Sequence, residues 1–253
     1  MTSDFIVGTA VLTRRSLRHV FRSLDSIIST TIMPISFMLL FVYVFGGAIS
    51  AGSASYVNYL LPGILLITVA SGVSYTAFRL FLDMKSGFFD RLHTMPISRS
   101  SVLWAHVVTS LMANVISLVV VVLVAVILGF RTGASPMEWL AVVGIVLLFT
   151  LTLTWMAVIA GLTARSSDSV SAFSYPLVFL PFISSAFVPT GTMPGPVRAF
   201  AQNQPVTSVV NALRALLSGG AVGASIWIAL SWFVAILTAS YVAAMLTYRR
   251  RIS

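Results

Sequence analysis

Hydrophobic residues fill six long runs of this chain, and polar residues gather in the segments between them. The runs cover residues 26–48, 57–82, 102–130, 137–162, 169–188 and 224–248. A helix needs about 20 apolar residues to cross the ~30 Å hydrocarbon core of a bilayer. The runs are continuous rather than alternating, which argues against barrel strands. The pattern predicts six transmembrane helices, with a kink at Pro34 in the first and breaks at Pro176 and Pro181 in the fifth.

An amphipathic segment precedes the first run. Within residues 1–25, three arginines recur every four residues with a fourth beside them, and apolar side chains follow at helical spacing on another face. The arginines are Arg14, Arg15, Arg18 and Arg22. We expect a basic helix in the membrane–water interface. A solvated cytoplasmic helix is the alternative.

A short polar stretch, residues 83–99, separates the second and third runs. It begins with Asp83 and contains Lys85, the only lysine of the chain. Phe88, Phe89 and further apolar residues recur at helical spacing up to Pro96. An ordinary solvated loop has no need for two adjacent phenylalanines, which are a liability when exposed. We therefore interpret residues 83–99 as a helical elbow that docks onto a partner.

The segment between the fifth and sixth runs, residues 189–223, is too long and too patterned for a simple loop. Residues 208–217 predict a short amphipathic helix, capped by Thr207 or Ser208 and ended by Gly219. Its apolar face comprises Val209, Val210, Leu213, Leu216 and Leu217, with Asn211 and Arg214 on the other face. We predict two short helices that enter the outer leaflet and turn back, shielded by protein.

Composition agrees with a single transmembrane domain over residues 1–253. The chain is 58% hydrophobic and 8% charged, with a mean hydropathy of +1.01, whereas soluble domains carry about 25% charged residues. Of the 15 Lys and Arg, only Arg131, Arg198 and Arg214 fall in outer segments if the amino terminus is inside. The positive-inside rule therefore predicts a multi-pass plasma-membrane protein with both termini cytoplasmic. Its net charge of +9 indicates contact with lipid rather than nucleic acid.

The chain lacks the residues that would let it supply its own energy. It has no Gly-x-x-x-x-Gly-Lys-[Ser/Thr] loop for ATP, no cysteine and no metal-ligand spacing among its three histidines. Its acids lie at span ends or in loops; Glu138, the only glutamate, begins the fourth span, where it favours the helix amino terminus. An enzyme or an ion-coupled carrier is therefore disfavoured, and the energy must come from a partner.

Two polar stripes run inside the spans. In the third span, four polar residues share one face, namely His106, Ser110, Asn114 and Ser117. We interpret them as interhelical hydrogen-bonding groups, with a substrate lining as the alternative. In the second span the stripe comprises Thr68, Ser71, Tyr75 and Arg79. Both interpretations stay open there, because an arginine is costly in a span unless it faces water or a partner.

Two motifs resemble the permease subunits of type 2 ATP-binding-cassette exporters, particularly their daunorubicin-resistance-like branch. One is the elbow end, Thr-Met-Pro-Ile-Ser-Arg at residues 94–99. The other is the outer segment with Met-Pro at 193–194, Gln-Asn-Gln-Pro-Val-Thr at 202–207 and Ala-Leu-Arg-Ala-Leu at 212–216. With the six runs and the basic first segment, the resemblance covers nearly the whole chain.

The resemblance implies two permease subunits, identical or closely related, above two ATPase subunits that bind ATP and magnesium. It implies that the first segment and the elbow contact the ATPase through Asp83, Lys85, Phe88, Phe89, Asp90, Arg91, Leu92 and Pro96. It also implies an outer gate near Asn203, Pro205 and Arg214. The chain differs from the usual family pattern in carrying Asp83 for a glutamate and Gln204-Pro205 for Asn-Pro.

These features predict export of an amphiphilic drug or lipid-like substrate between the two permeases. Export of a glycan or lipid-linked polymer is the first alternative. A stand-alone channel or secondary carrier is the second, although no internal repeat indicates it.

Overall fold

The computed structural model describes residues 24–46, 56–86 and 99–252, and every regular element in this part of the chain is a helix. The predicted all-helical class is thus confirmed. In order, the elements are α2 (Leu24–Leu40), the π-helix η1 (Phe41–Phe45), α3 (Tyr56–Lys85), α5 (Arg99–Ile127), α6 (Pro136–Thr163), α7 (Ser167–Phe179), the 3-10 helices η2 (Leu180–Ile183) and η3 (Thr190–Thr192), α8 (Gly195–Asn203), α9 (Pro205–Ser218) and α10 (Ser225–Ile252).

Five stretches of the described chain are long and apolar enough to cross a membrane, and they coincide with five of the six predicted runs. They are Ile28–Phe45, Tyr56–Lys85, Ser101–Ile127, Pro136–Thr163 and Ser225–Arg250. The chain is therefore a multi-pass membrane protein.

The fifth predicted run is shorter and more irregular than expected. Helix α7 has 13 residues and passes through Pro176, so the predicted break there is wrong. The amide of Leu180 still bonds to the Pro176 carbonyl, and α7 packs along α3. The helix changes to the 3-10 form at Leu180, just before Pro181, and the backbone is extended at Ser184. Together α7 and η2 rise by about 28 Å, so a sixth span stays a prediction.

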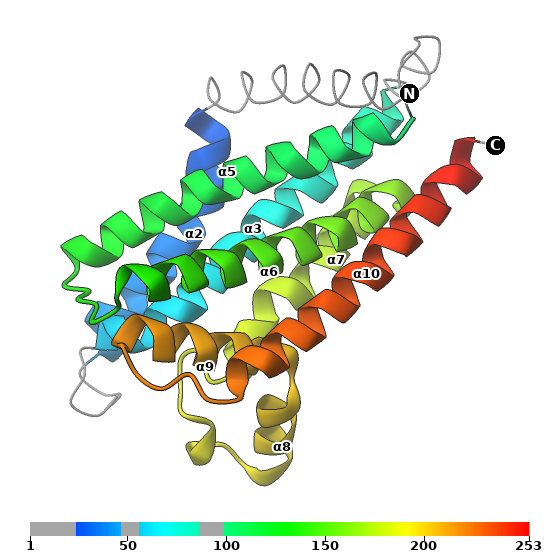
Figure 1. Cartoon of the computed structure of the whole chain (residues 1–253). Coiled ribbons are helices and arrows are strands. Elements are labelled where there is room, and N and C mark those ends of the chain that lie inside the picture. Colours follow the sequence, from blue (N-terminus) through cyan, green and yellow to red (C-terminus); the bar gives the residue numbers. More distant parts are fainter. Residues whose placement is uncertain (1–23, 47–55, 87–98, 253) are drawn as a thin grey trace.

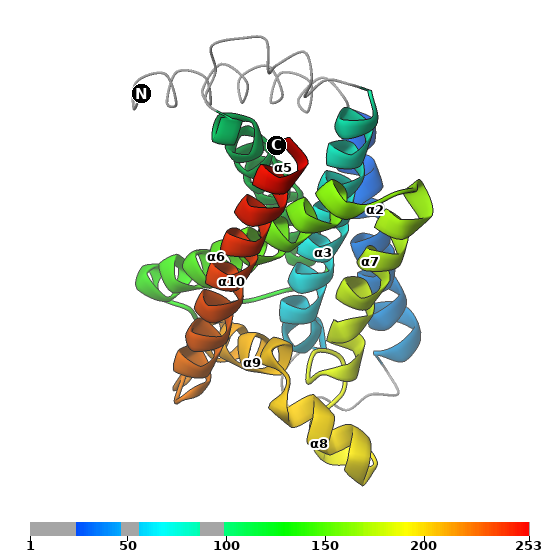
Figure 2. The ribbon, with the colours of Figure 1, turned by 90° about the vertical axis from the view of Figure 1, so that its right-hand side faces the viewer.

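Helix α3 forms the centre of the bundle. Figure 2 shows it between α6 and α10 on one side and α2 and α7 on the other. In the membrane-span windows, 83% of the α3 residues are buried, against 22% for the first span, 28% for α5 and 22% for α10. Fully buried leucines and isoleucines of α3, such as Leu60 and Ile64, anchor the main apolar core. The first span, α5 and α10 thus expose broad apolar faces to lipid or to other membrane proteins.

Helices α8 and α9 lie at one end of the bundle, remote from the carboxyl terminus (Figure 1). We call this the α9 end, and the opposite end, where α3 ends and α5 begins, the elbow end. Two short helices were predicted here, and two are found. The five predicted apolar residues of α9 are all buried, and Gly219 ends the helix with φ of +68°. The predicted cap is wrong, because α9 already begins at Pro205, whose fixed φ and missing amide suit a first helical position.

The start of α6 behaves as predicted for Glu138. The Ser135 hydroxyl accepts a hydrogen bond from the Glu138 amide at 3.3 Å, and the Glu138 carboxylate accepts one from the Ser135 amide at 2.6 Å. This reciprocal capping box satisfies two amides that the helix itself leaves unpaired.

Candidate functional site

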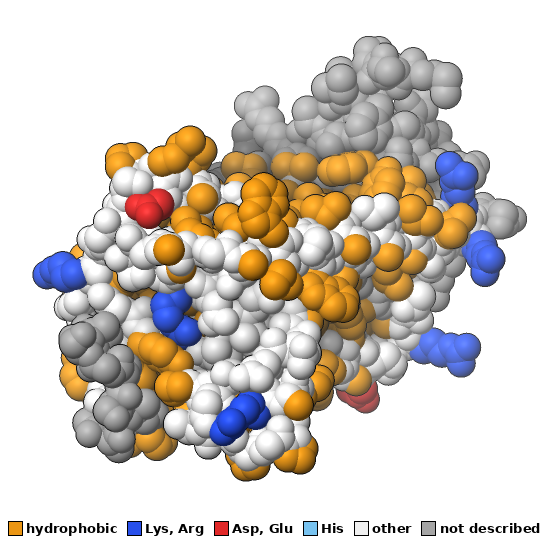
Figure 3. Space-filling model, turned by 60° about the horizontal axis from the view of Figure 1, so that its bottom comes forward, with side chains coloured by type: hydrophobic (Ala, Val, Ile, Leu, Met, Phe, Trp, Pro, Cys, Tyr) orange, Lys and Arg blue, Asp and Glu red, His pale blue; other side chains and the backbone are white. Residues whose placement is uncertain are grey.

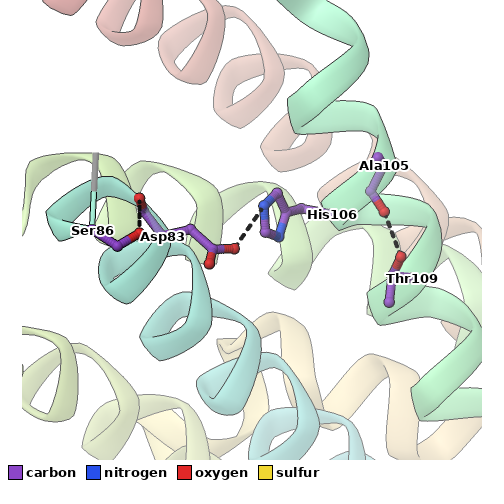
Figure 4. Close-up of polar contacts among 5 residues, drawn as sticks. All are labelled: Asp83, Ser86, Ala105, His106 and Thr109. Atoms are coloured by element: carbon purple, nitrogen blue, oxygen red, sulfur yellow. Dashed lines mark hydrogen bonds and ion pairs between the residues drawn. The ribbon is translucent and has the colours of Figure 1, made fainter. Parts of the chain in front are cut away.

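The elbow end holds a polar contact between the two helices that flank the predicted elbow. His106 Nε2 lies 3.4 Å from Asp83 Oδ2, joining the last turns of α3 to the first turns of α5 (Figure 4). The Ser86 hydroxyl donates to the Asp83 carbonyl at 3.0 Å and closes the end of α3. Lys85, in the last turn of the same helix, is exposed. Sequence analysis missed the Asp83–His106 pair, because the two residues belong to different helices.

Much of the predicted ATPase-coupling surface lies outside the described residues. This applies to the interfacial arginines and to most of the elbow, namely Arg14, Arg15, Arg18, Arg22, Phe88, Phe89, Asp90, Arg91, Leu92 and Pro96. Both borders of the elbow are described. They lie at the same end of the bundle (Figure 1).

The polar stripe of α5 makes interhelical hydrogen bonds, as interpreted from the sequence. Ser110 Oγ accepts from Thr76 of α3 at 2.8 Å and lies 3.4 Å from the Thr154 hydroxyl of α6. Ser117 and Thr30 of α2 lie 3.1 Å apart. Asn114 fits against Gly72, where a Cβ atom would come within 2.3 Å of its Oδ1. The stripe thus holds three helices onto α5.

The polar stripe of α3 does not form one continuous lining. Thr68 is fully buried and donates to the Ile64 carbonyl of its own helix at 2.8 Å. The Ser71 hydroxyl is buried without a hydrogen-bond partner among the described residues. Tyr75 has 37% of its surface exposed, and Arg79 is half-buried. The exposed part of the stripe is therefore nearer the elbow end.

Arg214 organises the α9 end. Its guanidinium donates to the Tyr59 carbonyl at 3.1 Å, to the Ser185 carbonyl at 2.7 Å and to the Ala186 carbonyl at 3.3 Å. The same group lies 3.8 Å from the centroid of the Tyr59 ring. Asn211, one turn earlier, accepts from the Ser185 hydroxyl at 2.7 Å. Arg214 is therefore an interior anchor rather than a solvated residue on the outer face of α9.

Further side chains complete this anchor around the non-helical backbone after η2. The Tyr59 hydroxyl donates to the Ser185 carbonyl at 3.1 Å, and Tyr56 donates to the Phe187 carbonyl at 3.3 Å. Gln204 donates to the Ile183 carbonyl. Residues 184–187 are all buried, so their carbonyls need these donors. We call this set the α9 anchor: Tyr56, Tyr59, Asn211 and Arg214 with residues 183–187.

Sequence analysis found only part of the α9 anchor. Tyr56 and Tyr59 were missed, although their three-residue spacing at the start of a predicted span places both on one helix face. The other two predicted gate residues lie beside the anchor. Asn203 is exposed and donates to the Ala199 carbonyl of its own helix at 2.8 Å, and Pro205 begins α9.

Figure 3 shows the molecule turned so that the bottom of Figure 1 comes forward, with apolar side chains spread widely and charges scattered. Within the described residues, no group of three or more His, Asp or Glu side chains could hold a metal ion. The described polar groups join helices. At the elbow end they do so through Asp83 and His106, and at the α9 end through Arg214.

Comparison with known proteins gives a consistent result. A sequence model of the ABC-2 type transporter family matches residues 8–218. The daunorubicin resistance ABC transporter permease protein DrrB1 of Streptomyces coeruleorubidus is 29% identical, over 81% of this chain and 76% of that protein. The probable doxorubicin resistance ABC transporter permease protein DrrC of Mycobacterium tuberculosis is 24% identical over 97% and 90% of the two chains. The putative transport permease ycf38 of Porphyra purpurea is 26% identical over 85% and 75%.

Proposed function

The chain belongs to the ABC-2 type transporter family, and we propose that it is the permease subunit of an ATP-driven exporter of amphiphilic drug or lipid-like molecules. In this proposal it lies in the plasma membrane with both termini cytoplasmic. It pairs with a second permease, identical or closely related. A separate ATPase subunit docks on the elbow end and binds ATP with magnesium.

The observation that carries the proposal is the family match across residues 8–218, together with two relatives whose names link them to daunorubicin and doxorubicin resistance. Those relatives are similar to this chain over most of both lengths. The export of a related amphiphile follows as the best-supported activity.

The Asp83–His106 contact supports coupling at the elbow end. Because it joins the end of α3 to the start of α5, a force on the elbow acts on both helices together. The hydrogen bond between Thr76 and Ser110 joins the same two helices deeper in the bundle. A movement of the ATPase would thus be transmitted along two packed helices toward the α9 end. Asn203, Pro205 and Arg214 border the outer gate in this scheme.

The packing of α3 supports a substrate path between two permeases rather than through one. Most of α3 is buried, and the polar residues that face α5 are hydrogen-bonded across helices. The exposed part of its stripe, at Tyr75 and Arg79, is where a substrate entering from the elbow end would meet this helix. Membrane lipid covers the remaining apolar faces.

The packing of Trp104 and Trp155 favours an amphiphile over a glycan at these two positions. Sugars stack on free aromatic faces, but Trp104 and Trp155 pack against each other at 5.3 Å between ring centroids. Trp155 also packs against Tyr241 at 4.8 Å. These rings are committed to contacts among α5, α6 and α10.

The test is to purify the chain from its native membrane and measure what accompanies it. An ATP-binding-cassette ATPase should copurify in equal amount, and substrate should stimulate ATP hydrolysis by the complex. Replacing Phe88 and Phe89 by alanine should uncouple hydrolysis from substrate while the complex stays soluble in detergent. Full stimulation in both variants would show that the elbow is not the coupling element, and purification without an ATPase would refute the exporter assignment.

A further inference from the structure

An open groove of about 520 Å³ lies between α6, α7 and α10, toward the elbow end. Its inner wall is apolar and includes Met156, Ala160 and Phe173. Arg165 and Ser169 border it where α6 gives way to α7. This groove is separate from the Asp83–His106 pair and from the α9 anchor. Its volume falls within the range of about 300–1,000 Å³ that is typical of small-molecule sites.

Ser240 of α10 also lines the groove, and its hydroxyl is unusual for this helix. Thr238 and Ser231 donate to carbonyls of α10 itself, at 2.8 Å and 2.9 Å. Ser240 is only 7% exposed as a residue, but its oxygen is not among the fully buried side-chain atoms of the described chain that lack a partner, which agrees with its position on the groove surface. The groove therefore presents a hydroxyl beside its apolar walls.

The polar groups of the groove are ordered along its length. Arg165 lies just beyond the end of α6, whereas Met156 lies two turns inside that helix, about 10 Å from its end. Tyr241, which follows Ser240, packs against Trp155, so Ser240 lies near the level of Met156. A ligand that fits this order has an anionic head at Arg165 and, further inside, a hydrogen-bonding group near Ser240 and an apolar chain along Met156 and Phe173. Glycerophospholipids have this order of groups, because their ester linkages lie between head and chains.

Charge at the elbow end favours the same ligand. The described side chains there include Arg79, Lys85, Arg165, Arg249 and Arg250, against Asp83, which faces His106, and Asp168. This excess of positive charge attracts anionic headgroups, and a cationic amphiphile would meet Arg165 unfavourably.

We propose that the groove between α6, α7 and α10 is a binding site for an anionic glycerophospholipid, with its phosphate at Arg165 and its ester region at Ser240. Helix α7 otherwise contacts mainly α3. Such a lipid connects α7 to α6 and α10. The site is distinct from the substrate path, and binding is measured without transport, so failure of this proposal leaves the proposed function untouched.

The experiment measures lipid binding to the full chain in detergent by native mass spectrometry, with dioleoylphosphatidylglycerol as the probe and dioleoylphosphatidylcholine as the neutral reference. Arg165→Gln should weaken binding of the anionic lipid about fivefold, as expected for one arginine near a headgroup. Arg249→Gln, an exposed change at the same end, is the matched control and should alter it less than twofold. Ser240→Ala should weaken binding of the anionic lipid about threefold, and Ala160→Trp, which fills the groove, should abolish it.

Several results would overturn the proposal. Equal losses in Arg165→Gln and Arg249→Gln would indicate general surface attraction. Equal binding of the two lipids would remove the headgroup assignment. Competition by inorganic phosphate alone, at the lipid concentration, would make the ligand a free anion. Tighter binding of dodecyltrimethylammonium, lost in Ala160→Trp, would make the groove a site for cationic amphiphiles.

Discussion

The two ends of the bundle use polar residues in opposite ways. At the α9 end, the guanidinium of Arg214 contacts carbonyls from two other segments, and Tyr56 and Tyr59 satisfy further carbonyls of the same buried backbone. At the elbow end, one pair, Asp83 and His106, joins the two helices that border the elbow, and the Asp83 side chain is 36% exposed. The α9 end is thus closed by the chain itself, while the elbow end leaves charge accessible.

The difference indicates which end of the bundle the chain can hold in one conformation without a partner protein. A partly buried arginine with several carbonyl partners resists displacement, because moving it would break several hydrogen bonds at once. A single polar contact that is partly exposed contributes much less to stability. The elbow end is therefore the end at which a partner's movement can most readily act.

The sharpest test of the comparison is Arg214→Ala. It removes the hydrogen bonds from the guanidinium to the Tyr59, Ser185 and Ala186 carbonyls, and we expect a loss of about 3 kcal/mol, seen as a fall in the thermal unfolding midpoint on the order of 10 °C. Arg198→Ala at the same end is the control, because Arg198 is exposed and, among the described residues, donates only to the Gly191 carbonyl. Similar losses in both variants would show that the α9 anchor does not stabilise the fold.

Gly63→Ala tests how tightly α3 packs on the same anchor. A Cβ atom at Gly63 would lie 2.6 Å from the Cβ of Ala186, so we expect a loss of about 1–3 kcal/mol from overpacking. Gly144→Ala on α6 meets nothing within 4 Å and should be neutral or slightly stabilising. Thermal unfolding in detergent compares the two, and an unchanged midpoint for Gly63→Ala would mean that this contact is loose.

Ser110→Ala probes the bundle between its two ends. The change removes the acceptor for Thr76 and the contact with Thr154. Interhelical hydrogen bonds in membranes average about 0.6 kcal/mol, so the loss should be about 1 kcal/mol, below that of Gly63→Ala. Ser231→Ala, an exposed change within α10, should have no measurable effect. A larger loss in Ser110→Ala than in Arg214→Ala would place the anchor of the fold at mid-bundle.

Asp83→Asn should have the smallest effect on stability and a distinct effect on coupling. Loss of the pair with His106 should lower stability by less than about 1 kcal/mol. Substrate-stimulated ATP hydrolysis of the complex should fall severalfold, because the pair joins the borders of the elbow. Asp168→Asn, an exposed change at the start of α7, is the control. A large fall in the unfolding midpoint without loss of coupling would show that the Asp83–His106 pair stabilises the fold, as Arg214 does, and does not act in coupling.

Sequence analysis found the parts of the fold that depend on local periodicity. Five predicted runs became long helices, and the apolar face of α9 is buried as expected. Helical spacing shows that Arg214 lies on the face of α9 away from the leucines. Sequence analysis therefore placed Arg214 on the polar face. It could not show that Tyr59, 155 residues away, lies beneath the guanidinium.

The chain by itself determined that this is a helical membrane protein, where its spans lie and which family it belongs to, because hydrophobic runs and short motifs are local features. Tertiary structure alone decided that α3 is central and that the fifth run becomes irregular after Phe179. It also decided that Arg214 lies where it can donate to the carbonyls of this irregular segment. The physical reason is that a buried carbonyl must find a donor, and its donors here come from helices distant in sequence. Only folding brings them together.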